Sequence, residues 1–208
     1  MGSRLQTGIE VLDRKLDGGL PPGCVVALTA DPASQSELIL YELTAARGSL
    51  YITTARSNDI VRHAIDISEA QAGSPTIREV NGDNPLEEAE KLVGALPEGA
   101  NLIIDPMDLL EESPPEDYLA FLNGVKDRMI ETGSIAVLHC LKGNGRSANR
   151  TTTEHVADAV FDLSTETDGM EIENLLSIPK YRAGGAPTET IKLELSERVE
   201  IDTSRDIA

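Results

Sequence analysis

The sequence is poor in aromatic residues and has no long apolar segment. Its 208 residues include no Trp, two Phe and four Tyr, although 40% of them are hydrophobic, so the core must be built from aliphatic side chains. No run of about 18 apolar residues is present, and the opening MGSRLQTGIE lacks the apolar centre of a signal peptide. We therefore expect a cytoplasmic protein that does not contact a membrane.

Cysteine and histidine are also rare, with two and three residues respectively. Cys24 and Cys140 lie in apolar runs, so we expect two buried, reduced thiols rather than a disulfide. His139, Cys140 and His155 do not have the spacing of a zinc site. The sequence therefore predicts no structural metal centre.

Basic residues are outnumbered two to one. The chain has 36 acidic and 18 basic residues, only six of them Lys, which gives a net charge of −18. Such a surface repels nucleic acid, so we do not expect a nucleic-acid partner. An acidic, lysine-poor composition is typical of proteins from salt-loaded cytoplasms, where salt screens the self-repulsion. We interpret the acidity as a halophilic adaptation.

Apolar strand-like runs alternate with amphipathic segments along most of the chain. This alternation predicts an α/β fold of three layers, with a mostly parallel sheet and a C-terminal antiparallel extension. We expect a single domain over 1–202 and a tail over 203–208. The expected strands are 25–29, 50–54, 76–80, 102–104, 135–138, 159–163, 171–179, 190–195 and 198–201; the expected helices are 37–47, 58–67 with Asn58 as N-cap, 85–96, 115–132 and a short one between 153 and 159; a loop is expected over 143–153.

Several segments together resemble a known family. They occur in the family's order over nearly the whole chain, and they are similar to KaiC-like and RadA-like members of the RecA ATPase superfamily. The resemblance implies a RecA-like P-loop NTPase fold, binding of ATP and Mg²⁺, and assembly into rings or filaments. The segments are TGI (7–9), GGLPPG (18–23), YITTARSNDIVRHA (51–64), LIIDPMDLL (102–110), HVADAVFDL (155–163) and IPKYRAGG (178–185).

The phosphate loop of that family is degenerate here. The family's G-x-x-x-x-G-K-[ST] uses glycines to expose N–H groups, Lys to bind phosphate and Ser/Thr to hold Mg²⁺. Ser36 stands in place of the Lys and Glu37 in place of the hydroxyl residue, while Asp31 adds a second carboxylate. We therefore expect no ATP and no other cofactor, with ATP and Mg²⁺ as the alternative. The loop comprises Ala30, Asp31, Pro32, Ala33, Ser34, Gln35, Ser36 and Glu37.

A second catalytic feature is missing as well. KaiC-like proteins carry a Glu-Glu pair after the second strand that activates water, and the matching residues are Ala55 and Arg56. Arg56 either neutralises Glu37 or Asp31, or is simply solvated.

Two polar residues of the family's site remain. Asp105 matches the Walker B aspartate, which orients Mg²⁺ in the family; alternatively it caps the next segment or bonds to the degenerate loop. His139 matches a polar sensor of the γ-phosphate; alternatively it is a buried, backbone-bonded histidine.

Two pairs of cations are further candidates. The resemblance places Lys180 and Arg182 where relatives contact a neighbour's nucleotide, which makes them trans-acting candidates; alternatively they neutralise local acid. Arg146 and Arg150 are weak nucleic-acid candidates in a loop without aromatic residues, and a flexible surface loop is the better interpretation.

The losses at two places favour a catalytically inactive pseudo-ATPase that acts as a regulatory, signalling or assembly partner. Its partner would be a protein: a second copy or an intact KaiC/RadA-like paralogue. One alternative is an ATP-binding ATPase in a mixed oligomer, with Lys142 or Lys180 supplying the missing cation. The other is a DNA-associated recombinase accessory protein.

Overall fold

The computed structural model describes residues 4–143, 147–168, 171–185, 187–195 and 199–201. The strands are β1 (Val25–Ala30), β2 (Ser49–Thr53), β3 (Thr76–Glu79), β4 (Asn101–Asp105), β5 (Ile135–Leu141), β6 (Ala159–Asp168), β7 (Glu171–Tyr181), β8 (Ile191–Leu195) and β9 (Val199–Ile201). The helices are α1 (Glu10–Lys15), α2 (Ser36–Leu43), α3 (Asn58–Ile67), α4 (Pro85–Gly94), α5 (Asp108–Glu111), α6 (Pro115–Thr132) and α7 (Arg150–Val156).

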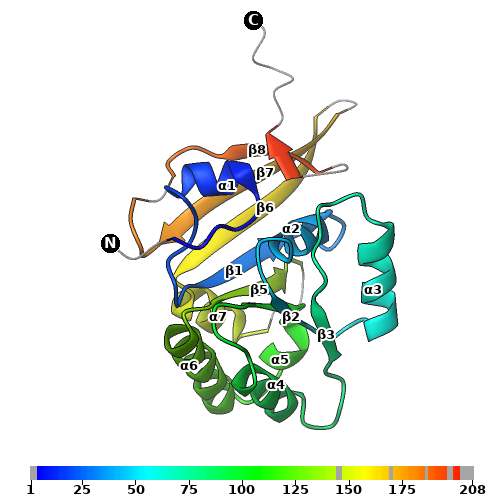
Figure 1. Ribbon diagram of the computed structural model, residues 1–208, viewed down its shortest axis with the longest axis vertical. Coiled ribbons are helices and arrows are strands. Elements are labelled where there is room, and N and C mark those ends of the chain that lie inside the picture. Colours follow the sequence, from blue (N-terminus) through cyan, green and yellow to red (C-terminus); the bar gives the residue numbers. More distant parts are fainter. Residues whose placement is uncertain (1–3, 144–146, 169–170, 186, 196–198, 202–208) are drawn as a thin grey trace, which may run out of the picture.

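The described strands form one sheet in the order β3-β2-β4-β5-β1-β6-β7-β8-β9 (Figure 1). Adjacent strands in the part β3-β2-β4-β5-β1-β6 are parallel to each other. The pairs β6–β7, β7–β8 and β8–β9 are antiparallel and extend the sheet. This confirms the expected α/β architecture with its C-terminal antiparallel extension. The predicted tail, 203–208, lies outside the described residues.

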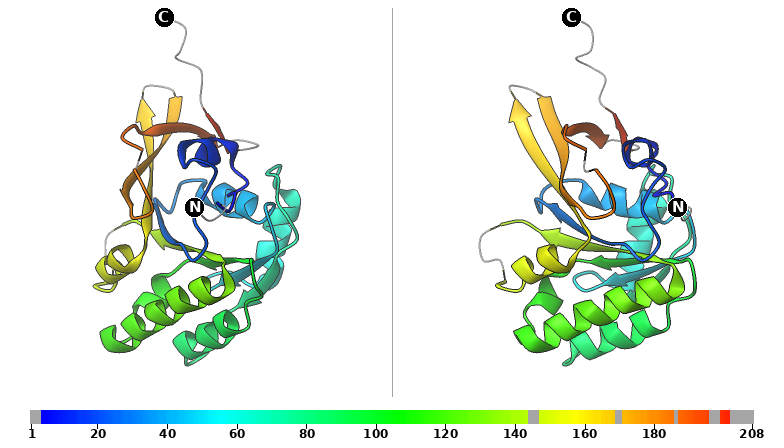
Figure 2. Two further views of the ribbon diagram at one scale, coloured as in Figure 1. Left: turned by 60° about the vertical axis from the view of Figure 1, so that its left-hand side comes forward. Right: turned by 90° about the vertical axis from the view of Figure 1, so that its left-hand side faces the viewer.

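Each face of the sheet has its own aliphatic core, because successive residues of a strand point to opposite sides. In β1, Val26 and Leu28 belong to one cluster, and Val25 and Ala27 belong to the other. The first cluster also contains residues of α1, α2 and α3, and β7, β8 and β9 curl over α1 and α2 (Figure 2). The second cluster contains residues of α4, α5 and α6 on the opposite face.

Helix boundaries follow local chemistry. The predicted helix 115–132 is confirmed as α6, which begins at a proline and ends before Gly133 in a left-handed conformation, φ 61°. The N-cap of α3 is Ser57, whose hydroxyl accepts a hydrogen bond from the N–H of Ile60, so the prediction of Asn58 as the cap was wrong. α2 ends at Leu43 rather than at 47, because the N–H groups of Thr44 and Ala45 bond three residues back and tighten the last turn.

Several other boundaries also differ from expectation. β5 continues to Leu141 because its backbone stays paired with β1 as far as Ala30. The predicted loop 143–153 was wrong at its end, where α7 begins at Arg150, and the short helices α1 and α5 were not predicted. Cys24 and Cys140 are buried free thiols, as expected. None of the helices in the described ranges is long and apolar enough to cross a membrane.

The carboxyl ends of β1, β4 and β5 lie at one edge of the sheet. Parallel pairing aligns Ala30 with Leu141 and places Asp105 beside Thr53 of β2. In open α/β sheets this edge is where ligands bind. The residues of the degenerate loop, together with Asp105 and His139, therefore meet there.

Candidate functional site

The segment 30–37 forms a turn closed by its own polar groups. The carbonyl of Asp31 accepts hydrogen bonds from the N–H of Ser34, at 2.9 Å, and from its hydroxyl, at 2.6 Å. Gln35 precedes α2 without a side-chain cap, and α2 begins at Ser36. The first N–H groups of a helix have no intrahelical acceptor, so the start of α2 still offers donors. Across 30–37 the side chains supply two carboxylates and no cation.

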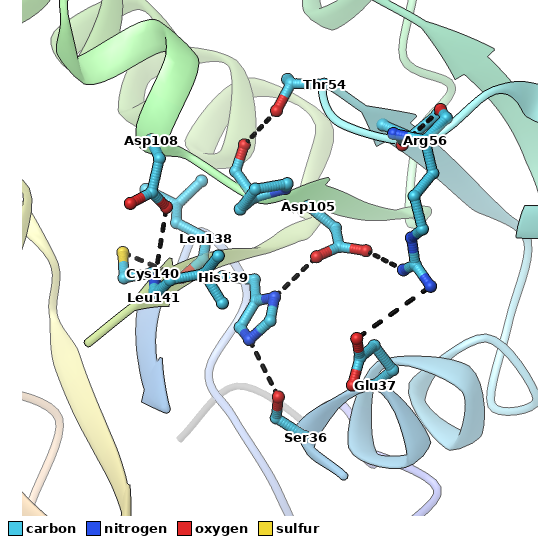
Figure 3. Close-up of polar contacts among 12 residues, drawn as sticks. Ser36, Glu37, Thr54, Arg56, Asp105, Asp108, Leu138, His139, Cys140 and Leu141 are labelled. Atoms are coloured by element: carbon cyan, nitrogen blue, oxygen red, sulfur yellow. Dashed lines mark hydrogen bonds and ion pairs between the residues drawn. The ribbon is translucent and has the colours of Figure 1, made fainter. Parts of the chain in front are cut away.

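Ser36, His139 and Asp105 form a hydrogen-bonded chain (Figure 3). Ser36 Oγ lies 3.0 Å from His139 Nε2, and His139 Nδ1 lies 2.6 Å from Asp105 Oδ1. All three residues are buried, with exposed fractions of 2%, 1% and 3%. These two hydrogen bonds thus link the first residue of α2 to the ends of β5 and β4.

The second carboxylate oxygen of Asp105 is held by two further side chains. Tyr51 donates its hydroxyl hydrogen to Oδ2 at 2.5 Å, and Arg56 Nη2 also donates to Oδ2 at 2.5 Å. Glu37 lies 4.0 Å from Arg56 Nη1, at the start of α2 (Figure 3). Thr53 fixes the backbone of Arg56 by donating to its carbonyl and accepting from its N–H. Arg56 thereby joins the strand end that carries Asp105 to α2.

These contacts determine the ionisation of the network. Burial raises the pKa of Asp105, but the hydrogen bond and charge of His139, the hydrogen bond of Tyr51 and the charge of Arg56 outweigh it and lower that pKa to about 2. Burial and Asp105 raise the pKa of Tyr51 well above its usual value, so the phenol keeps its proton. Asp105 is therefore a carboxylate that only accepts hydrogen bonds, and His139 Nδ1 must carry the hydrogen between them. In neutral His139, Nε2 then accepts a hydrogen bond from Ser36.

Lys142 directly follows β5, but its ammonium group does not reach the turn over 30–37. Its Nζ lies 2.7 Å from Asp162 Oδ1 and donates to the carbonyl of Leu163 at 2.7 Å. Asp162 also accepts from the hydroxyl of Thr29, at 2.5 Å. The ammonium group is thus held toward β6, on the side of β1 away from His139.

Lys180 and Arg182 bind the C-terminal end of α7 in their own chain. Lys180 Nζ donates to the carbonyls of Glu154 and His155, both at 2.7 Å. Arg182 donates to the carbonyls of His155 and Val156 and lies 3.9 Å from Asp158. Cations at a helix C-terminus stabilise it through the dipole and the unpaired carbonyls.

Arg150 lies in the interior, so the expectation of a flexible surface loop was wrong for this residue. Its side chain is 3% exposed, and Nε donates to both oxygens of the fully buried Glu111, at 2.8 and 2.9 Å. Nη1 donates to the carbonyl of Leu141 at 2.7 Å, and Nη2 lies 3.2 Å from Asp108. A guanidinium paired in this way is not available to a nucleic acid. Arg146, the other candidate, lies outside the described residues.

The model of the Family of unknown function (DUF7125) matches residues 4–208. The chain belongs to this family. No curated protein matches the chain.

Solved structures of other proteins resemble the fold of this chain. The chain is similar to a KaiC-like protein from the hyperthermophilic archaeon Pyrococcus horikoshii OT3, with a TM-score of 0.74 and 18% identity over 95% of this chain and 98% of that one. It is also similar to the flagellar accessory protein FlaH from Methanocaldococcus jannaschii, with a TM-score of 0.74 and 14% identity over 96% and 98%. At these identities the likeness shows the fold alone, which is the RecA/KaiC-like fold expected from the sequence.

The contacts of His139, Asp105 and Arg56 distinguish between the alternatives considered for each residue. His139 is buried, but its ring bonds to two side chains rather than to the backbone. Asp105 is connected to the loop through His139, and Arg56 pairs with Asp105 more closely than with Glu37. Neither the Arg56–Asp105 pair nor the role of Tyr51 was expected from the sequence. The available signal was position, because Tyr51 and Arg56 flank the end of a strand next to the one that ends at Asp105.

Proposed function

We propose that this chain is a pseudo-ATPase with the KaiC/RecA-like fold, inactive in ATP hydrolysis, that acts as a regulatory, signalling or assembly partner. The proposal depends on one observation above all. Arg56 and Tyr51 hold one oxygen of Asp105, and His139 holds the other. In the family that the sequence resembles, the matching aspartate orients Mg²⁺. Here a guanidinium supplies the positive charge.

The charges of the loop support the same proposal. A triphosphate brings several negative charges, and the loop meets it with Asp31 and Glu37 and without an ammonium group. The ammonium of Lys142 is paired with Asp162, 2.7 Å away, which argues against its serving as a substitute. The N–H groups at the start of α2 are the one favourable element left, and a helix terminus contributes about 1 kcal/mol.

Titration calorimetry with Mg·ATP tests this proposal directly. Molar KCl in the buffer screens the net charge of −18. We expect a Kd weaker than ~100 µM, which corresponds to about 5.5 kcal/mol. A matched variant with Ser36→Lys and Glu37→Thr restores the cation and the hydroxyl, and should bind more tightly than the natural chain. Binding by the natural chain that is tighter than ~100 µM contradicts the proposal.

The partner in this proposal is a protein. The fold matches that of the KaiC-like structure from P. horikoshii over 98% of its length, so the scaffold through which such a partner would assemble is present. Light scattering coupled to size exclusion, on the chain alone and mixed with an intact paralogue, measures assembly. A monomer that stays separate in every mixture contradicts the assembly role. DNA binding is disfavoured because Arg150 is buried against Glu111.

A further inference from the structure

The three residues of the hydrogen-bonded chain come from different elements in a particular order. Ser36 lies where β1 turns into α2, Asp105 is the last residue of β4, and His139 lies near the end of β5. A serine on a strand–turn–helix, followed in the chain by an acid and then a histidine from later strand ends, is also the arrangement of α/β-hydrolase nucleophiles. Such a triad is recognised by geometry and roles rather than by fold.

We propose that Ser36, His139 and Asp105 form an acyl-transfer site, with Ser36 as the nucleophile and His139 as the general base. The Ser36–His139 distance of 3.0 Å is within reach for proton transfer, and Asp105 at 2.6 Å orients the ring. Because Asp105 only accepts hydrogen bonds, it fixes the hydrogen of His139 on Nδ1. Nε2 is thereby left to take the proton of the serine hydroxyl.

The reaction balances with an ester and water alone. Ser36 Oγ bonds to the carbonyl carbon of the ester while its proton moves to His139 Nε2. The bond between that carbon and the alcohol oxygen breaks, and the alcohol leaves with the proton from His139. Water then attacks the acyl-serine through the same base, releases the carboxylic acid and restores the Ser36 hydroxyl.

The start of α2 supplies the electrostatic part of the site. The first N–H groups of a helix have no intrahelical acceptor, and they carry the positive end of the dipole. Ser36 and Glu37 are the first two residues of α2, so their N–H groups are among these donors, at the helix end that carries the Ser36 hydroxyl. Donors in this position stabilise the oxyanion of a tetrahedral intermediate.

The surrounding charge selects the class of substrate. Asp31 and Glu37 outnumber Arg56 around the turn that precedes Ser36, and Arg56 is already paired with Asp105. Anionic esters are repelled, so the substrate is an uncharged carboxylic ester. Ser36 is only 2% exposed, which limits the acyl group to a small one and requires the turn over 31–35 to yield as it enters.

Two neutral reagents test this site. Phenylmethylsulfonyl fluoride forms a sulfonyl ester with an activated serine and releases fluoride, and peptide mass mapping then locates the label. p-Nitrophenyl acetate reports turnover through the released nitrophenol. We expect one label, on Ser36, and ester hydrolysis that Ser36→Ala abolishes. His139→Gln should slow both reactions at least about 100-fold, because it removes the base.

Ser68→Ala is the matched control. Ser68 directly follows α3, outside the site, and its hydroxyl accepts a hydrogen bond from the N–H of Ala70, so labelling and hydrolysis should be unchanged. Thermal unfolding of each variant separates lost chemistry from lost structure. Absence of label on Ser36 in the folded natural chain, or equal labelling in the folded His139→Gln variant, overturns the proposal. Neither result changes the ATP titration, so the two proposals fail separately.

Discussion

Arg56 and Asp105 form an ion pair of 2.5 Å in which the carboxylate is buried and the guanidinium is partly exposed. The pair connects the loop after β2 to the end of β4, and it neutralises a charge that would otherwise be buried against His139 and Tyr51. Removing one partner of such a pair costs more than the pair itself contributes, because the remaining charge stays in the interior.

Arg56→Ala should therefore lower the free energy of unfolding by about 2–4 kcal/mol. Urea denaturation in molar KCl measures the change. The control is Arg62→Ala, which removes an exposed arginine from α3 and should change stability by less than about 0.5 kcal/mol. Equal effects of the two substitutions would show that the pair does not stabilise the fold.

Acidification should weaken the same network. The pKa of Asp105 is lowered from 3.8 to about 2 in the folded chain, so its contribution is complete above pH 3.8 and is lost as the pH falls toward 2. The shift corresponds to about 2 kcal/mol. Because other carboxylates also titrate there, the measurement is the difference between the natural chain and Asp105→Asn in urea denaturation at pH 5 and pH 2.5. A difference that does not change over this range contradicts the assignment.

Arg150 should behave as a structural residue. Arg150→Met leaves the fully buried Glu111 without its cation, and should cost about 3–5 kcal/mol of stability. The double variant with Glu111→Gln should recover part of the loss, since no charge then remains unpaired. An unchanged free energy of unfolding in Arg150→Met would contradict the structural role and favour the interpretation of Arg150 as an exposed loop residue.

Lys180 and Arg182 offer a test of action in cis against action in trans. If they only secure the end of α7, Arg182→Ala should cost less than about 1 kcal/mol, because the side chain is half exposed. It should also leave the turnover of a mixture with an intact ATPase paralogue unchanged. Loss of that turnover with Lys180→Ala, at unchanged stability, would support the trans-acting hypothesis instead.

The thiols should be unreactive in the folded chain. Burial raises the pKa of Cys24 to about 12 and also raises that of Cys140, so neither forms the reactive thiolate near neutral pH. We expect a thiol-exchange reagent such as Ellman's reagent to detect no cysteine under native conditions and both after unfolding in urea. Rapid native labelling would contradict the burial of these residues.

The sequence allowed the sheet to be predicted because its signals are local. Apolar runs marked β1, β2 and β4, and proline and glycine marked the limits of α6. Residues of the degenerate loop were identified through the spacing of a motif. Which side chains pair at the site depends on how strands that are distant in the sequence are aligned in the sheet. The sequence near Arg56 therefore did not show that Arg56 would pair with Asp105 more closely than with Glu37.

Arg150 shows the same limit from the other side. In the sequence it follows polar and glycine residues, which is typical of an exposed loop. Its burial depends on Glu111, 39 residues earlier, whose carboxylate is enclosed by the packing of α5 against the core. A charged residue is predicted to be exposed unless its partner is known, and pairing of this kind has no periodicity to reveal it.

The position of β1 in the sheet has a consequence for biosynthesis. β1 is complete at Ala30, but both of its neighbours, β5 and β6, are made more than 100 residues later, the second ending its contacts with β1 at Leu163. While the ribosome is still extending the chain, the backbone of this central strand has neither neighbour to bond to. Contacts of such long range slow folding, so the sheet cannot form around β1 until most of the chain has been synthesised. A chain truncated before residue 163 would leave one edge of β1 incompletely paired and prone to aggregation.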